Sequence, residues 1–153
     1  MAEKFAKQFT PGIRAMVGGV LFLAGLIWQF ASNKTLDMYA FYMMSAGILC
    51  FTNVLAEKMS KGTSSPIPFL LLNMAVMITG FSLSASTAVE GVVMYGIWGI
   101  CVIVDWVVNT VLLNDDNDSM GRRIAFGFVT TLLNVILIGI VFMVPVLIAA
   151  FRM

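Results

Sequence analysis

Long apolar stretches separated by short polar clusters dominate the chain. Within each stretch the apolar residues follow one another, without the alternation of a half-buried strand or the one-sided periodicity of a surface helix. The five stretches cover residues 13–31, 36–56, 67–85, 91–113 and 124–149. Each reaches the ~17–25 residues that an α-helix needs to cross the hydrocarbon core of a bilayer. The pattern predicts an all-α, polytopic membrane helix bundle with five transmembrane helices, forming a single transmembrane domain over 1–153.

The polar clusters between these stretches predict short connections. They lie at 32–35, 57–66, 86–90 and 114–123, and they are rich in Ser, Asn, Asp, Gly and Pro. These residue types favour turns and end helices.

The distribution of basic residues predicts the orientation. With the N-terminus inside, seven of the nine Lys and Arg residues fall on the inner side: Lys4, Lys7, Arg14, Lys58, Lys61, Arg122 and Arg123. Only Lys34 and Arg152 fall outside. The positive-inside rule then predicts a cytoplasmic N-terminus and an external C-terminus, in a bacterial inner membrane or a plasma membrane. An even number of spans would move Arg152 to the inner side, and this residue alone does not decide between the two.

The first stretch has two interpretations. A basic start followed by an apolar centre is shared by signal peptides and membrane anchors. The apolar run is long, and Gln29 stands where a cleavage site needs a small residue. An uncleaved anchor is therefore the favoured interpretation.

Composition limits the chemistry. The chain is 60% hydrophobic and 11% charged, its net charge is +1, and it contains no histidine. Nucleic-acid binding needs clustered basic residues on a solvated face, so no nucleic-acid partner is expected. Both cysteines, Cys50 and Cys101, lie inside apolar stretches, where cysteine behaves mainly as a small apolar residue. We expect no metal and no cofactor.

Asp105 is the only charged residue in the stretch 91–113. A carboxylate in the middle of a membrane helix costs roughly 2.5–3.5 kcal/mol on insertion scales. Such a residue is usually paired, protonated or functional, which makes Asp105 the first candidate for chemistry.

Four asparagines are predicted at similar depth to Asp105, in the inner half of the membrane. Asn53, Asn73, Asn109 and Asn134, together with Asp105, are distributed over four predicted helices. Lipid offers no hydrogen bonds, so these side chains should face one another or a wet cavity. Asp105 and Asn109 are four residues apart and therefore share a helix face.

This candidate cluster has two interpretations. It either holds the helices together or forms a functional polar pocket. If Asp105 is ionised, the candidate charge partners are Arg14 and Arg122, whose long side chains reach inward from the inner surface.

No enzyme signature is present. Asp116 opens a segment that begins like a calcium-binding loop, but position twelve is Gly127 rather than Glu. The chain has no phosphate-binding Gly-rich loop followed by Lys, no paired catalytic carboxylates and no nucleophile beside a base. We therefore expect a non-enzymatic protein.

A shift of 56 residues aligns the first two stretches with the next two. It pairs Tyr39 with Tyr95, each at the start of an inward-running helix, and Asn53 with Asn109, each near the end of that helix. This predicts a parallel two-helix repeat related by an axis along the membrane normal.

The repeat carries a resemblance to a known family. Tyr42 to Ile48 (YMMSAGI) and Tyr95 to Ile100 (YGIWGI), followed by a Gly-containing span with Pro145 near its end, resemble the HdeD-type acid-resistance membrane proteins of bacteria. That family usually has six spans, one more than expected here. The resemblance implies an inner-membrane protein with a role in stress or acid tolerance, and it implies no chemistry for any residue.

These observations lead to two functional hypotheses. The first is a small non-enzymatic integral membrane protein with an accessory or stress-tolerance role. The second is a small proton-linked transporter or channel subunit that uses Asp105. Membrane lipid is the expected partner, together with a second copy of the chain or another membrane protein, because Gly18 and Gly19 provide a close-packing surface.

Overall fold

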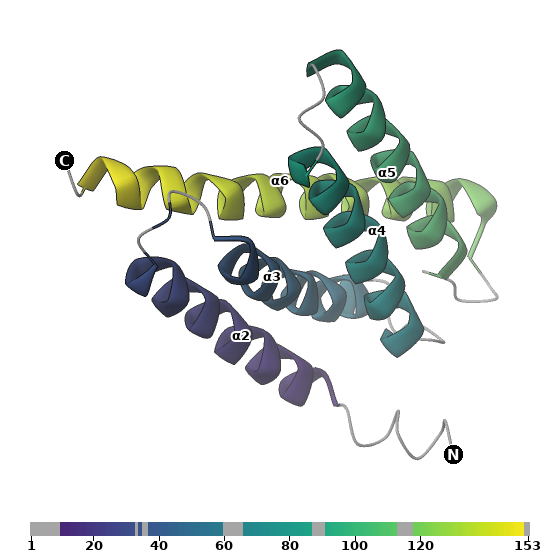
Figure 1. The fold of residues 1–153 in the computed structure, drawn as a ribbon. Helices are drawn as coiled ribbons and strands as arrows, with labels where there is room; N and C mark the ends of the chain where they lie inside the picture. The colour runs from purple at the N-terminus through teal and green to yellow at the C-terminus, as the bar shows by residue number, and fades with distance from the viewer. Residues whose placement is uncertain are drawn as a thin grey trace. The chain divides into compact units, whose positions relative to one another are not determined.

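The computed structural model describes residues 10–32, 34, 37–59, 66–86, 91–112 and 118–151. Within these ranges the chain forms five α-helices and no strand (Figure 1). The helices are α2 (Pro11–Ala31), α3 (Met38–Met59), α4 (Pro66–Ser86), α5 (Gly91–Leu112) and α6 (Met120–Phe151). The all-helical prediction is confirmed. The predicted turns beyond these ranges, and Arg152, lie outside the described residues.

Three helices are long and apolar enough to cross a membrane: α2, α3 and α6. In α4 and α5 the corresponding apolar segments are shorter, Leu70–Gly80 and Tyr95–Val111. Helix α6, with 32 residues, is about 48 Å long, which exceeds a hydrocarbon core of roughly 30 Å. A tilt or a bend at Pro145, which removes one backbone donor, accommodates such an excess. The helices mark the chain as a membrane protein, and the count of five spans stays a prediction.

The chain divides into two compact units. The first comprises Met1–Val54 and Leu133–Met153, and the second comprises Leu55–Leu132. Helices α2, most of α3 and the C-terminal part of α6 therefore belong to the first unit. Helices α4 and α5 and the N-terminal part of α6 belong to the second.

In the first unit, glycine allows α2 and α3 to approach closely as an antiparallel pair. A Cβ atom added at Gly47 would lie 2.5 Å from the carbonyl oxygen of Gly18 and 2.8 Å from the backbone nitrogen of Phe22. One added at Gly25 would lie 2.8 Å from the carbonyl oxygen of Ala40. Small residues serve this purpose in membranes, where packing rather than water exclusion joins helices. Gly18, on which the homo-oligomer prediction depended, thus packs against α3 of the same chain. The oligomeric state stays a prediction.

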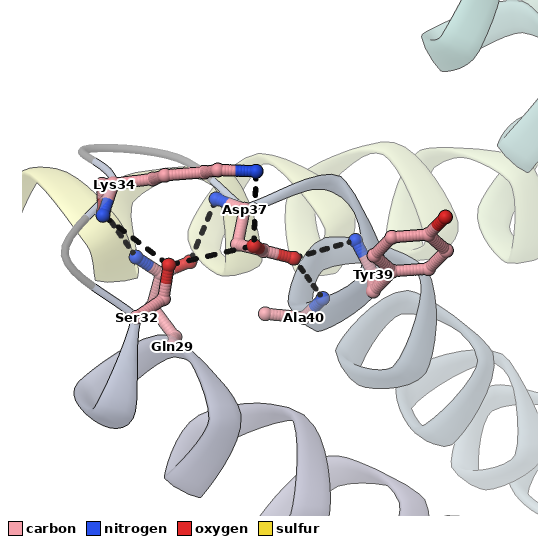
Figure 2. Close-up of polar contacts among 6 residues, drawn as sticks. All are labelled: Gln29, Ser32, Lys34, Asp37, Tyr39 and Ala40. Atoms are coloured by element: carbon pink, nitrogen blue, oxygen red, sulfur yellow. Dashed lines mark hydrogen bonds and ion pairs between the residues drawn. The ribbon is translucent and has the colours of Figure 1, made fainter.

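The connection between α2 and α3 is held by two buried polar side chains (Figure 2). Gln29 Nε2 donates to the carbonyl oxygen of Lys34 at 3.1 Å, and Gln29 Oε1 accepts from the backbone N–H of Asp37 at 3.1 Å. Asp37 Oδ1 accepts from the backbone N–H of Tyr39 at 3.0 Å and of Ala40 at 3.4 Å. An aspartate in this position satisfies donors that a helix start leaves unpaired. The connection is therefore held by hydrogen bonds of Gln29, at the end of α2, and of Asp37, just before α3.

In the second unit, α4 packs on α5 through Gly80, and α5 packs on α6 through Gly127. A Cβ atom at Gly80 would lie 2.8 Å from Cβ of Cys101, and one at Gly127 would lie 2.8 Å from the backbone nitrogen of Thr110. These approaches bring the polar side chains of the three helices within hydrogen-bonding distance.

We predict that Gly47→Ala destabilises the protein by about 1–3 kcal/mol, the usual cost of overpacking a close contact. The added methyl group would meet backbone atoms of α2, which cannot rotate away. The matched control is Gly19→Ala, whose Cβ would find Phe51 Cζ at an ordinary 3.7 Å. Both variants gain the same helix propensity, so unfolding titrations of the two in mixed micelles isolate the steric effect. Equal stability of the two variants would contradict the close packing.

Candidate functional site: a buried network around Asn109

Asp105 and Asn109 lie on the buried face of α5. Both are 0% exposed, whereas the neighbouring Val104 and Trp106 are exposed. The four-residue spacing places the two polar side chains one turn apart on the same face. Because the outer face of α5 is apolar, the helix can carry a carboxyl group inside while it presents apolar side chains outside.

The carboxamide of Asn109 connects three helices. Its Nδ2 donates to Asp105 Oδ2 at 3.0 Å and to Thr131 Oγ1 of α6 at 2.7 Å. Its Oδ1 accepts from Nδ2 of Asn73, on α4, at 2.9 Å. An amide nitrogen carries two hydrogens, and both have an oxygen acceptor here. Asn109 is therefore the centre of the Asn109 network, which consists of Asn73, Asp105, Asn109 and Thr131.

The geometry of the network is compatible with proton exchange at Asp105. A carboxyl oxygen accepts an amide N–H both when the group is ionised and when its other oxygen carries a proton. The hydrogen bond from Asn109 can therefore persist while Asp105 gains or loses a proton. In apolar surroundings such a bond is stronger than in water, which favours a fixed carboxyl orientation.

The structure brings together three of the five residues that sequence analysis placed in the cluster: Asn73, Asp105 and Asn109. Asn53 and Asn134 are also buried, and both belong to the first unit. Thr131 was not among the predicted site residues. The signal for it was available, because Thr130 and Thr131 interrupt an otherwise apolar part of α6 just before Asn134.

Arg14 and Arg122, the candidate charge partners of Asp105, have other contacts in the structure. Arg14 is buried on α2, and its Nη1 donates to Asn53 Oδ1 on α3. Arg122 Nη1 lies 3.1 Å from Asp118 Oδ1, one helical turn earlier in the sequence, and the guanidinium lies over the ring of Phe126. Arg14 thus joins α2 and α3 in the first unit, as Asn109 joins α4, α5 and the N-terminal part of α6 in the second.

Metal binding has no support in the part of the chain that the structure describes. No three His, Cys, Asp or Glu side chains gather there as a set of ligands. The donors and acceptors of the Asn109 network are carboxamide, hydroxyl and carboxyl groups, which hold one another and can hold a proton.

We predict that Asn109→Leu is markedly more destabilising than Asn73→Leu. The first variant removes all three hydrogen bonds of the Asn109 carboxamide and leaves buried groups on three side chains with one partner fewer, whereas the second removes only one of these three bonds. We expect a loss of roughly 2–3 kcal/mol for Asn109→Leu and about 1 kcal/mol for Asn73→Leu. Unfolding titrations of both single variants and of the double variant measure the coupling between them. Additive and equal losses would show that Asn109 is not the centre of the network.

Comparison with known proteins adds no assignment to this geometry. No protein-family model, curated protein or solved structure matches the chain. The resemblance to HdeD-type proteins therefore stays a prediction.

Proposed function

We propose that the chain is a small, non-enzymatic integral membrane protein that acts as an accessory protein within the bilayer. The Asn109 network carries this proposal, because its side chains hydrogen-bond to one another across three helices. The same helices present large apolar side chains outward, such as Val107 on α5 and Ile136 on α6. This arrangement suits contact with lipid and with other membrane helices.

In this proposal all five helices span the membrane. Helices α4 and α5, with 21 and 22 residues, are each long enough to cross a core of roughly 30 Å. The distribution of Lys and Arg supports a cytoplasmic N-terminus and an external C-terminus, in an inner or plasma membrane. The support for a role in stress or acid tolerance is the resemblance of the two Tyr-containing segments to HdeD-type proteins.

A second function, a small proton-linked transporter or channel subunit, is favoured by one observation. Asp105 is fully buried and is oriented by an amide donor within an apolar helix. Intramembrane acids commonly mark proton relays and ion pathways. In this case Asp105 is the titrating group, and Asn109 positions it.

The proposed topology predicts that cysteines placed at Ser64 and Ser86 react from opposite sides of the membrane. The native Cys50 and Cys101 are first replaced, and an impermeant thiol reagent is then applied to intact cells and to inverted vesicles. Because α4 would cross the bilayer between the two positions, one should be labelled in each preparation. Labelling of both from one side would remove α4 as a span.

Replacing Asp105 separates the two proposed functions. Asp105→Asn keeps a polar side chain of the same shape without the ability to titrate, whereas Asp105→Leu removes both properties. For an accessory protein, Asn is tolerated and Leu lowers stability by around 1–2 kcal/mol, the scale of interhelical polar contacts. For a proton-linked carrier, Asn folds with normal stability and is inactive.

The corresponding measurements are unfolding titrations and proton flux into proteoliposomes that contain a pH-sensitive dye. The matched control is Asp118→Asn, which removes the carboxylate that pairs with Arg122 outside the apolar part of α6. Flux that survives Asp105→Asn would exclude Asp105 as the proton carrier. Unchanged stability and flux in Asp105→Leu would exclude both roles for this residue.

A further inference from the structure

The carboxamide of Asn109 has two possible directions. Its oxygen and its nitrogen are similar in size, and a half-turn about the last side-chain bond exchanges them without moving the rest of the residue. In the structure the oxygen faces Asn73 of α4, and the nitrogen faces Asp105 of α5 and Thr131 of α6. The direction matters because it decides which group donates the hydrogen bond at Asp105.

In the observed direction Asp105 is the acceptor. Asn109 Nδ2 donates to Asp105 Oδ2 at 3.0 Å, a bond that forms with an ionised carboxylate and with the carbonyl oxygen of a protonated carboxyl group. In the reversed direction two oxygen atoms would face each other, and only a proton on Asp105 Oδ2 could join them. The reversed direction therefore holds the proton on Asp105, whereas the observed direction allows the carboxyl group to release it.

Thr131 decides between the two directions. The bond between Asn73 and Asn109 can form either way, because each carboxamide carries a donor and an acceptor and both can reverse together. The bond between Asn109 and Asp105 can also form either way once Asp105 is protonated. Only in the observed direction does the second N–H of Asn109 have an acceptor within the network, which is the hydroxyl oxygen of Thr131. A buried N–H that loses its acceptor is costly, so this hydroxyl favours the observed direction.

The surroundings of Thr131 strengthen this preference. Its side chain is buried on α6, in the same compact unit as α4 and α5. The bond from Asn109 Nδ2 to Thr131 Oγ1 is 2.7 Å, at the short end of the range for N–H donors. Lipid offers no substitute acceptor. The hydroxyl of Thr131 is therefore the group on α6 that orients the carboxamide of Asn109.

We propose that Thr131 is a positioning residue: through the carboxamide of Asn109 it keeps Asp105 a hydrogen-bond acceptor, so that the carboxyl group can release a proton as well as bind one. This inference deepens the second proposed function, the proton-linked transporter or channel subunit, and its functional part rests on that proposal.

The test is an infrared measurement on the full-length protein reconstituted in vesicles. The C=O stretch of protonated carboxyl groups is recorded at acidic pH, and the band of Asp105 is isolated as the difference from Asp105→Asn. The C=O stretch moves to lower frequency when the carbonyl oxygen accepts a hydrogen bond. We expect Thr131→Val to shift the Asp105 band to higher frequency, because the carbonyl oxygen then loses the N–H of Asn109. Thr131→Ser, which restores the hydroxyl, should return the band to its wild-type position.

The matched control is Thr130→Val. Thr130 is buried beside Thr131 in the sequence of α6 and is not part of the Asn109 network, so the same chemical change there should leave the Asp105 band in place. An unshifted band in Thr131→Val, or an equal shift in Thr130→Val, would overturn the role of Thr131.

Proton flux into dye-loaded vesicles separates this inference from the function on which it rests. We expect flux with the wild-type protein and about tenfold less with Thr131→Val, the equilibrium effect of one buried hydrogen bond. Wild-type flux that is unchanged in Thr131→Val would overturn the role of Thr131 alone. A wild-type protein without flux would overturn the proton-linked function and the functional part of the inference, whereas a shifted band would still support the positioning of Asp105. Absence of an Asp105 band at acidic pH would overturn both.

Discussion

A polar side chain inside an apolar membrane helix can find its hydrogen bonds only on other protein groups, and this constraint organises the described part of the chain. Lipid supplies neither donors nor acceptors, so each such side chain must be matched across a helix interface. The carboxamide of Asn109 shows the consequence most fully, because its two N–H hydrogens and its oxygen are bonded to groups on α4, α5 and α6. The Arg14–Asn53 hydrogen bond serves the same purpose between α2 and α3.

Such bonds require the helix backbones to be close, and glycine provides this proximity. The α2–α3 pair combines the Arg14–Asn53 bond with a glycine contact at Gly47. The α4–α5 pair combines the bond between Asn73 and Asn109 with a glycine contact at Gly80. In both pairs an asparagine in the second half of the second helix bonds to a polar residue in the first half of the first. This shared arrangement matches the positions of Asn53 and Asn109 in the predicted two-helix repeat, and the repeat itself stays a prediction.

The helices were predictable because their signal in the sequence is strong. Runs of apolar residues bounded by turn-forming residues place each described helix within a few residues of its predicted bounds. The meeting of Asp105 and Asn109 was also predictable, since a spacing of four residues defines a common helix face. The inclusion of Asn73 followed from its predicted depth in the membrane.

The remainder of the site depends on which helix faces meet, and a single sequence carries little information about this. Depth alone grouped Asn53 and Asn134 with Asp105, and their place in the cluster stays a prediction. Thr131 was missed because threonine is common in apolar helices, where its hydroxyl can bond to its own backbone. The role of Asp37 as a helix-capping residue was missed for a related reason: the predicted second stretch began before it, at residue 36.

The structural and chemical roles of Asp105 are compatible in this geometry. Asn109 is held by Asn73 and Thr131 independently of its bond to Asp105, so its amide stays oriented whether or not the carboxyl group is ionised. A network of this kind orients a carboxyl group in an apolar helix through a hydrogen bond from an uncharged amide. The hydrogen bonds of Asn109 hold the helices together, and the same bonds would position Asp105 to exchange a proton if water reaches it. The two proposed functions therefore make the same demand on the helices around Asp105, and they differ in whether water reaches its carboxyl group.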